Sequence, residues 1–441
     1  MSSSVTSIKM KVNQAEQLKT AISAATDVNP MTLYLTYGKV TTWANDAAPD
    51  TANSSIASAY EVWLNMIGGK RILGSDVMHV IPRYNWTANT NYYAYDHMST
   101  DLYDKQFYVM TSDYNVYKCL SNNFNSNSTV QPTAVNPTTV TQTSDGYIWK
   151  YMYSVSDSEQ LRFTTAQYIP VKSIPTSDGS LQSQVQTNAV DGAIYSIILA
   201  NTGSGYSNSS NMIIEISGDG QSATATANVN VSSGKVSTIT MTNYGLGYTF
   251  ANVSIAGGGG SGAIGRAIIT PFGGHGSDAL YELGGSALMF NPSFKFNEGG
   301  KMPSTNDFRQ IAIVKDPLTR DGSAQMDNTA FFQAYTLTTV GSGDYVQDEI
   351  LYQGVSVASA IFSGRLLSWD SANGIATLIN TLGAPTSQSL IGANTSTSRF
   401  VSKIVDKDVK EHSGYILYLN NLTPITRSSD QIEDFKLIVK S

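Results

Sequence analysis

The stretch IYSIILANTGSGY, residues 194–206, decides how the middle of this chain folds, because it returns as VSTITMTNYGLGY at residues 236–248. Both copies end in a GxGY pattern, on Tyr206 and Tyr248, and are offset by 42 residues. Apolar residues recur with period 2 in each copy, and the closing glycines are typical of turns. The repeat therefore predicts two equivalent β-strands, each followed by a glycine turn.

A second part of the repeat follows each GxGY pattern. IEISG at residues 214–218 matches VSIAG at residues 253–257, with an offset of 39. Each copy is then a strand, a GxGY turn, a strand, a glycine-rich turn and a strand of small residues. Two such units predict a small all-β module built by duplication, inserted at residues 189–271.

Outside the module, strands dominate and helices are expected near the amino end. Asn13 and Glu16 form a capping-box pattern, and the first helical unit is expected to end at Asn29–Pro30. A second helix is expected after a cap at Ser54 or Ser55, with Gly68–Gly69 as its left-handed end. Its apolar stripe is formed by Ile56, Tyr60, Trp63 and Ile67.

Alternating apolar runs bounded by turn residues predict strands along the rest of the chain. They are residues 31–37, 76–81, 106–110, 116–120, 146–155, 308–314, 415–419 and 435–439. Residues 121–143 are rich in Asn, Ser, Thr and Pro and predict a long loop. We expect Trp63 and Trp149 in domain cores.

The expected fold class is mainly β with a few helices (α+β), with β-sandwich and β-barrel domains and a discontinuous core carrying β insertions. We predict five parts: a core of residues 1–90, 295–344 and 406–441; a Tyr-rich β insertion, 91–188; the duplicated module, 189–271; a connecting turn and short helix, 272–294; and a small β-barrel-like part, 345–405.

Composition excludes several classes of protein. Charged residues make up 14% of the 441, against about 25% in typical soluble domains, which disfavours coiled coils and disordered chains. A net charge of −7 disfavours a polybasic nucleic-acid binder. A single cysteine, Cys119, excludes an internal disulfide framework and a cysteine-based zinc cluster. Neither a secretory signal nor an apolar run of membrane-spanning length is present, so we expect synthesis in a cytoplasm and no membrane partner.

A GxGxxG pattern at residues 260–265 is the first candidate for a chemical site. A dinucleotide site needs that pattern to leave a strand and open a helix. The following residues 266–270 are too short for a helix and run into Pro271. The pattern therefore favours a turn in the β module.

Paired carboxylates for sugar cleavage are the second candidate, because Tyr and Trp on β scaffolds often bind sugars. The available acids are Asp76, Asp96, Asp101, Asp104, Asp113, Asp145, Glu215 and Asp278. Nothing in the sequence brings two of them to the required spacing. Acids beside glycine, such as Asp145–Gly146, are more often turn formers.

Nucleophile and histidine candidates are equally weak. There is no GxSxG elbow, and Cys119 in a predicted strand is expected to be buried and inert. His275, between two glycines, and His412 are expected to be turn residues that bond to backbone. Arg83 is expected to be a surface or interface arginine. We therefore predict no catalytic, cofactor-binding or metal-binding residue, and no cofactor.

Five separated motifs, in order, resemble one family. They are YLTYGKVTTW (34–43), HVIPRYNW (79–86), DGYIWKYMYSV (145–155), DFRQIAIVKDPL (307–318) and EHSGYILYLNNLTPITR (411–427). Together they resemble the baseplate wedge subunit encoded by gene eight of T-even-type contractile-tail bacteriophages. GGHGSDALYELGG at 273–285 is similar to a segment of marine and cyanophage members.

The resemblance implies a non-enzymatic structural protein of the virion, built of β-sandwich domains flanked by helices. It also implies a homodimer in the tail baseplate that contacts other wedge proteins and the components carrying tail fibres. The module at 189–271 and the length of 345–405 depart from the family pattern. Two alternatives stay open: a carbohydrate-binding or carbohydrate-cleaving tail protein, and a tail-fibre connector of the same virion.

Overall fold

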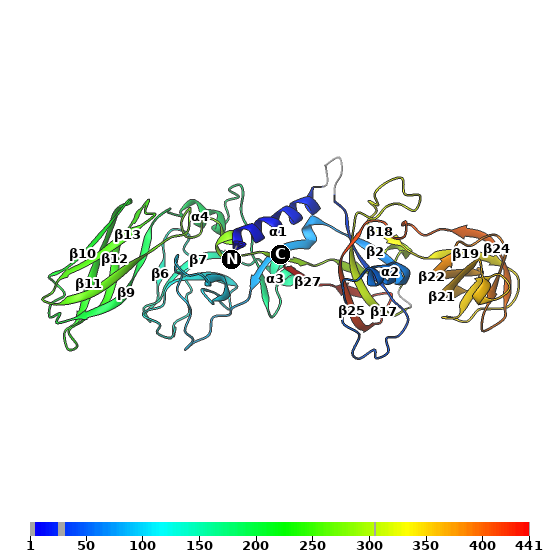
Figure 1. Cartoon of the computed structure of the whole chain (residues 1–441), viewed down its shortest axis with the longest axis horizontal. Helices are drawn as coiled ribbons and strands as arrows, with labels where there is room; N and C mark the ends of the chain where they lie inside the picture. The colour runs from blue at the N-terminus through cyan, green and yellow to red at the C-terminus, as the bar shows by residue number, and fades with distance from the viewer. Residues whose placement is uncertain (1–4, 25–30, 304–305, 441) are drawn as a thin grey trace, which may run out of the picture. The chain divides into compact units, whose positions relative to one another are not determined.

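A computed structural model describes residues 5–24, 31–303 and 306–440 (Figure 1). Strands account for 42% and helices for 13%, so the expected mainly β class with a few helices is confirmed. The chain divides into two compact units, and each unit draws on segments far apart in the sequence. Unit 1 comprises residues 1–16, 78–289 and 438–441, and unit 2 comprises residues 17–77 and 290–437.

The five helices of the described residues are short, apart from the first. They are α1 (Ile8–Ser23), α2 (Ile56–Asn65), α3 (Asp157–Phe163), α4 (Leu181–Thr187) and α5 (Ala279–Glu282). The predicted capping box at Asn13 and Glu16 is wrong, because α1 begins earlier, where the Ser7 Oγ accepts from the Met10 N–H at 3.3 Å. The predicted end at Asn29–Pro30 lies outside the described residues.

Unit 2 is organised around a five-stranded antiparallel sheet. Its order is β18 (Ala330–Phe332), β2 (Met66–Ile72), β1 (Leu33–Gly38), β17 (Phe308–Lys315) and β25 (Tyr415–Ile425). Strand β1 is buried along its whole length, which fits its central place and its apolar and aromatic residues. The Tyr34 hydroxyl donates to the Asn328 carbonyl at 2.6 Å, so residues nearly 300 positions apart meet in this core.

The predicted end of the second helix at Gly68–Gly69 is also wrong. Helix α2 stops at Asn65, and the chain enters β2 at once in an extended conformation at Met66. The two glycines lie inside β2, where a Cβ on Gly68 would stand 2.7 Å from the Phe331 carbonyl oxygen and one on Gly69 2.7 Å from the Phe331 ring. The glycines are needed because β18 packs directly on them, which a single sequence does not reveal.

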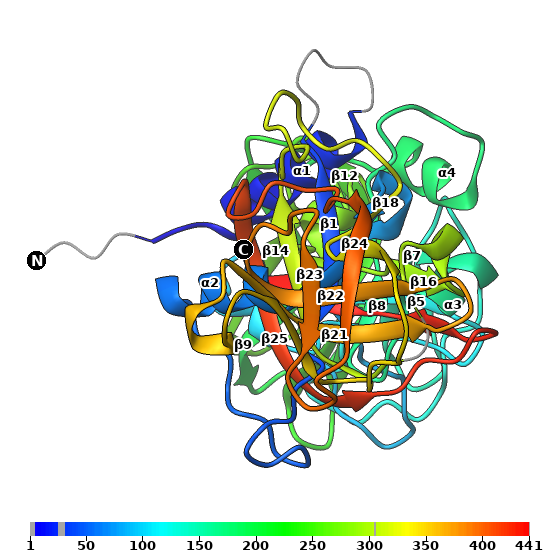
Figure 2. The ribbon, with the colours of Figure 1, turned by 90° about the vertical axis from the view of Figure 1, so that its right-hand side faces the viewer.

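A small closed barrel forms the other large part of unit 2, and Figure 2 looks onto its strands. It consists of β19 (Tyr335–Val340), β22 (Ile375–Gly383), β21 (Phe362–Asp370), β20 (Ile350–Gln353), β23 (Ser389–Gly392) and β24 (Ser398–Val405). Inward residues such as Leu337, Leu351 and Leu378 are fully buried. A two-stranded sheet joins β16 (Ser293–Lys295) to β26 (Ile432–Asp434).

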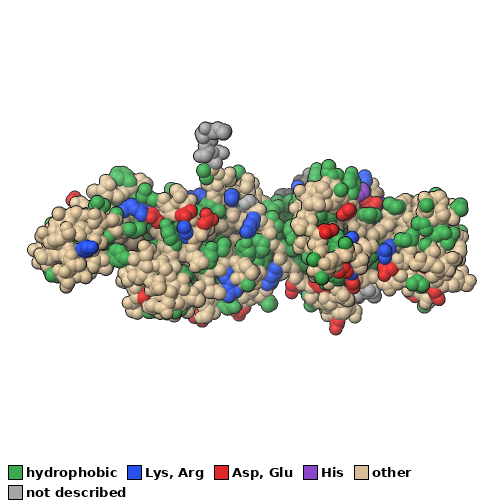
Figure 3. Space-filling model, turned by 60° about the horizontal axis from the view of Figure 1, so that its bottom comes forward, with side chains coloured by type: hydrophobic (Ala, Val, Ile, Leu, Met, Phe, Trp, Pro, Cys, Tyr) green, Lys and Arg blue, Asp and Glu red, His purple; other side chains and the backbone are tan. Residues whose placement is uncertain are grey.

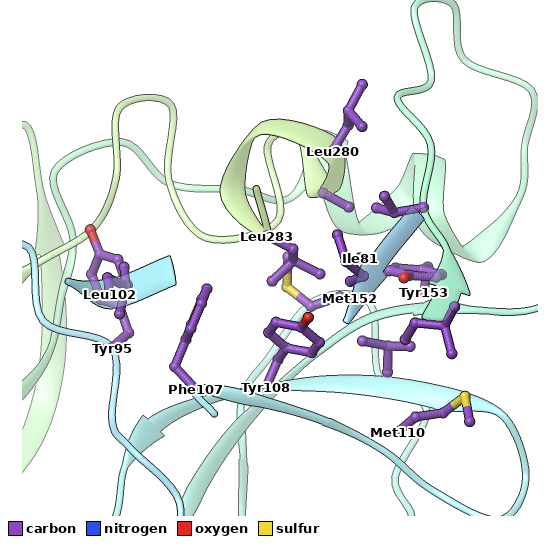
Figure 4. Packing of buried hydrophobic residues seen from close by; sticks show 14 of the residues in the cluster. Ile81, Tyr95, Leu102, Phe107, Tyr108, Met110, Met152, Tyr153, Leu280 and Leu283 are labelled. Carbon is purple, nitrogen blue, oxygen red and sulfur yellow. The ribbon is translucent and has the colours of Figure 1, made fainter. Parts of the chain in front are cut away.

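Unit 1 contains a Tyr-rich sheet and a second four-stranded sheet. The first has the order β4 (Tyr108–Met110), β5 (Asn115–Ser121), β7 (Ile148–Ser154), β6 (Thr141–Gln142), and the second has the order β27 (Leu437–Lys440), β15 (Ala287–Phe290), β3 (Val77–Pro82), β8 (Tyr168–Pro170). Figure 4 shows Leu283, at the end of α5, close to Met152 of β7 and Tyr108 of β4, and Leu280 of α5 belongs to the same buried cluster. The connecting segment after the module is thus anchored in this core.

The repeat module completes unit 1, with the predicted strand and turn order in both copies. The first copy gives β9 (Ile194–Ser204), β10 (Met212–Gly218) and β11 (Gln221–Asn230), and the second gives β12 (Lys235–Leu246), β13 (Ala251–Gly257) and β14 (Ser261–Ile269). The copies interleave reciprocally: β9 pairs with β14, β11 pairs with β12, and the middle strands β10 and β13 pair with each other.

Both GxGY turns are built alike. All four of their glycines have φ between 63° and 78°, a backbone conformation that favours glycine. Tyr206 and Tyr248 turn inward and are buried. Their hydroxyls accept from the backbone N–H groups of Ala263 (3.3 Å) and Ala223 (3.4 Å), which hold equivalent places in the other copy. Each tyrosine therefore fastens its own turn to the third strand of the other copy.

Candidate interaction site

An apolar groove on unit 2 is the clearest candidate for contact with another molecule. Helix α2 and the start of β25 enclose about 270 Å³. The lining residues are Ile56, Ala59, Tyr60, Trp63, His412, Gly414, Tyr415 and Ile416. None of them is an acid, a lysine or an arginine, so the groove offers contact area rather than charge.

Local sequence explains why α2 presents this face. The Ser55 Oγ caps the helix by accepting from the Ser58 N–H at 3.1 Å, as predicted for one of the two serines. Trp63 packs in the core of the five-stranded sheet. Tyr60, one turn earlier, remains 57% exposed, and Ile56, two turns earlier, remains 77% exposed. The apolar stripe of α2 therefore extends beyond the core, toward the amino end of the helix.

His412 joins the helix to the strand. Its ring lies edge-on to the Tyr60 ring at 4.8 Å and to the Trp63 ring at 6.2 Å. The residue has a positive φ of 59°, in a tight turn where a Cβ on Gly414 would stand 2.2 Å from the Lys315 carbonyl oxygen. The structure thus gives His412 a packing role against aromatic rings in a turn.

Strand β25 is an edge strand, and its two halves differ. The Trp43 indole N–H donates to the Leu422 carbonyl at 3.0 Å, and the Asn421 amide donates to the Asp50 carbonyl at 2.9 Å, so the carboxyl half is covered. In the amino half, Tyr415 is 69% exposed and Leu417 lies at a break in the register with β17. Edge strands and exposed apolar patches are recurrent places of protein association.

The candidates considered for chemistry lie apart from this groove, except for His412. The described residues contain no group of three or more His, Cys, Asp or Glu that could hold a metal ion. Cys119 is fully buried in β5, and burial raises the pKa of its thiol far above the usual range. The GxGxxG pattern runs from a turn into β14 and does not begin a helix, so these residues do not form a dinucleotide-binding site.

Two of the candidate acids next to glycine turns or helix ends serve as local structural partners of the backbone. Asp145 accepts from the Thr129 and Val130 N–H groups at 2.7 and 2.9 Å, as a turn former does. Asp278 caps α5 by accepting from the Leu280 N–H at 3.0 Å. Glu215 is exposed on β10. Arg83 bonds to the Asn85 side chain and the Thr165 carbonyl, and so braces loops of unit 1.

His275 departs from expectation. It is buried, and its Nδ1 has no hydrogen-bond partner in the part of the chain that the structure describes, so the expected backbone bond from this atom is not formed. Nδ1 lies 3.9 Å from Glu282 Oε2, which bonds to the Lys118 ammonium at 2.8 Å. Glu282 Oε1 accepts from the Gly276 N–H at 2.7 Å. Through these contacts, the segment that follows the module (Gly276 to Glu282) is attached to Lys118 of the Tyr-rich sheet.

Sequence reasoning did not find the groove. Ile56 and Tyr60 belong to the stripe expected to face the core, and spacing alone does not distinguish a buried from an exposed part of a stripe. His412 lies some 350 residues from α2, and only the fold brings it there. No local feature of the sequence marks their meeting.

Comparisons with known proteins add no identification: no protein-family model matches the chain, and no curated protein sequence does either. Within the described residues, no helix is both long and apolar enough to cross a membrane.

Proposed function

We propose that this chain is a non-enzymatic structural subunit of a contractile-tail bacteriophage baseplate wedge. In this role it forms a homodimer, binds neighbouring wedge proteins and the components that carry tail fibres, and resides in the virion after assembly in the host cytoplasm. The five ordered motifs support the family. The weakly charged surface suits permanent protein contacts, since interface cores are depleted of charged residues.

The observation that carries the proposal is the uncharged apolar groove between α2 and β25. A monomer in water gains nothing by leaving Ile56, Tyr60 and Tyr415 exposed together, whereas a partner surface removes them from water. We assign a second copy of this chain to the groove. In a two-fold dimer the same patch meets itself, and a patch without carboxylates, lysines or arginines brings none of those charges against its own copy.

The test is the mass of the full chain in solution, measured by analytical ultracentrifugation over a concentration series. We expect a dimer, and we expect Ile56→Glu and Tyr60→Glu to shift it to monomer because each places a charge in an apolar contact. Leu161→Glu is the matched control: Leu161 is equally exposed but lies on α3 of unit 1.

Two results would count against the proposal. A chain that stays monomeric at its highest soluble concentration contradicts the dimer. A dimer that survives both groove substitutions contradicts the groove as its interface. Copy number per virion separates a wedge subunit from the alternative of a tail-fibre connector. Hydrolysis of a polysaccharide by the purified chain would replace the structural role by the alternative of a carbohydrate-cleaving protein.

A further inference from the structure

A cleft in unit 1 has a different chemistry from the groove. It encloses about 710 Å³, a size typical of ligand sites. One wall is formed by β9 and β12, the first strands of the two repeat copies, and the other by the end of β5 and the loop 121–125. Uncharged polar groups and backbone cover most of the module in Figure 3, where it lies at the left.

Aromatic rings line both walls. Tyr195 of β9 and Tyr244 of β12 form a pair with ring centroids 4.4 Å apart. Neither hydroxyl makes a hydrogen bond within the described part of the chain, and both groups remain partly open to solvent. The opposite wall contributes Tyr93 and Phe124. Flat apolar faces with free hydroxyl donors are thus available together.

Phe124 is held in a costly conformation. Asn123, Phe124 and Asn125 have φ values of 46°, 57° and 60°, so three successive non-glycine residues lie in the left-handed region. For Phe this costs on the order of 1 to 3 kcal/mol, and such strain clusters at functional sites. Bonds from neighbours maintain the turn, including one from the Asn125 N–H to the Asn122 side-chain oxygen at 3.2 Å. The side chain gains only partial burial in return, because Phe124 is 50% exposed.

The polar groups of the cleft are amides and hydroxyls. The side chain of Gln142 has no hydrogen-bond partner within the described residues. The Asn228 side-chain amide donates to the Thr238 hydroxyl at 3.1 Å, and within the same residues its side-chain oxygen stays free to accept. Asp96 is the lining residue with a charge. Two nitrogens of the Arg266 guanidinium donate to its carboxylate, one of them (Nη1) to Oδ1 at 2.9 Å. The ion pair leaves no net charge to attract an ionic ligand.

We infer that this cleft binds a neutral oligosaccharide. A sugar ring presents an apolar C–H face for Phe124 or the tyrosine pair, and hydroxyls that both donate to and accept from amides. Binding without cleavage is inferred, because glycoside hydrolysis needs two carboxyl groups across the bond and Asp96 is alone in the lining and already paired. This inference is independent of the proposed role in the baseplate and of the dimer groove.

The experiment measures binding of the full chain to an array of neutral and acidic glycans, with titration calorimetry on the best neutral one. Phe124→Gly is the decisive variant. Glycine relieves the left-handed backbone, so the thermal midpoint of unit 1 should hold or rise, while loss of the ring should weaken binding about tenfold. Tyr244→Ala should weaken it similarly. Phe250→Ala, exposed on the same module but outside the lining, should leave affinity unchanged.

Each other outcome overturns the inference. The wild-type chain binding none of the neutral glycans would exclude it. Preference for acidic glycans with loss at high salt would indicate an ionic site instead. Equal loss in the Phe250→Ala variant would place binding elsewhere. A photo-crosslinker at position 142 that captures a segment of another virion protein, with no glycan bound, would make the cleft a protein-docking site. A fall in thermal midpoint for Phe124→Gly, together with unchanged affinity for Tyr244→Ala, would mean that the Phe124 ring is structural and that the glycan binds outside the cleft.

Discussion

Single residues in this chain show how burial and charge decide which side chains carry structure. Trp149 stacks on Tyr147 with ring centroids 5.4 Å apart and is fully buried, and Trp63 is almost as well covered. Lys118, Glu282 and His275 are equally buried but charged or titratable. The two tryptophans stabilise their units through buried apolar area. The buried Lys118 and Glu282 avoid the cost of burying a charge only while they form their ion pair.

Replacing Trp149 or Trp63 by alanine should cost about 3–5 kcal/mol of unfolding free energy, because each leaves a large cavity in a close-packed core. The readout is soluble yield together with urea unfolding followed by circular dichroism. Leu161→Ala, at an 80% exposed position, should change little. Soluble Trp149→Ala protein of wild-type stability would contradict this placement in the core.

The buried cluster should make unit 1 sensitive to acid. Burial, with Lys118 nearby, lowers the pKa of His275 from 6.5 to about 3. Below pH 6.5, His275 is therefore protonated in the unfolded chain but still neutral in the folded chain. Burial opposes ionisation of Glu282, but Lys118 and His275 outweigh it and lower its pKa from 4.5 to about 2. Stability is therefore present at neutral pH and lost as the pH falls through both windows.

Between pH 6.5 and 4.5 the histidine contribution can be seen without that of Glu282. The unfolding free energy should fall there by up to about 1.4 kcal/mol per pH unit. His275→Gln should flatten that slope. The measurement is thermal unfolding at steps of pH; a wild-type curve level over this window would contradict the role of the cluster.

At the scale of elements, turn chemistry is the most predictable feature. The strand and turn order of both repeat copies follows from period-2 patterning and from the GxGY glycines, and the Ser55 cap follows from the amino end of α2. What the sequence did not predict is where elements end against neighbours. Gly68 and Gly69 read as a helix end, yet they lie in β2 because Phe331 needs the space that a side chain would fill.

The two glycines of each GxGY turn should differ in their tolerance of alanine. At Gly245 (φ 63°) a Cβ would stand 2.6 Å from the Gln221 carbonyl oxygen, whereas at Gly247 (φ 75°) it would meet nothing within 4 Å. Gly247→Ala should cost about 1 kcal/mol through its backbone conformation alone. Gly245→Ala should cost about 1–3 kcal/mol more, because the β11–β12 pair must move.

Hydrogen–deuterium exchange of β11 and β12 measures the difference. Faster exchange is expected for Gly245→Ala than for Gly247→Ala, and the same order should hold for Gly203 and Gly205 in the first copy. Equal exchange in the two variants would mean that Gly245 is required only for its positive φ and not for the space beside Gln221.

At the scale of the whole molecule, scarcity of charge is the property with the widest consequences. Charged residues are 14% of the chain, and several lie in internal pairs, such as Arg309 with Asp46 at 2.9 Å and Arg427 with Glu433 at 2.9 Å. Pairing of this kind reduces the charge that is left to steer association. Under the proposed function, contacts between copies should therefore depend on apolar area.

The proposed dimer should accordingly tolerate salt. Raising sodium chloride from about 0.1 to 1 M shortens the screening length from about 10 to 3 Å, which weakens ionic contacts but not apolar ones. Sedimentation at both concentrations should give the same monomer–dimer constant within about twofold. Dissociation at the higher concentration would indicate an ionic interface and would contradict the groove as its location.

The sequence by itself determined the mainly β class, the duplicated module, the GxGY turns and the burial of Trp63, Trp149 and Cys119. These depend on periodicity and on backbone conformation within a few residues. Tertiary structure alone decided the interleaving of β9 with β14, the closure of the barrel, the groove at α2 and the cleft beside Phe124. Each of these joins residues far apart in the chain, and the free energy of such contacts depends on partners that local sequence does not specify.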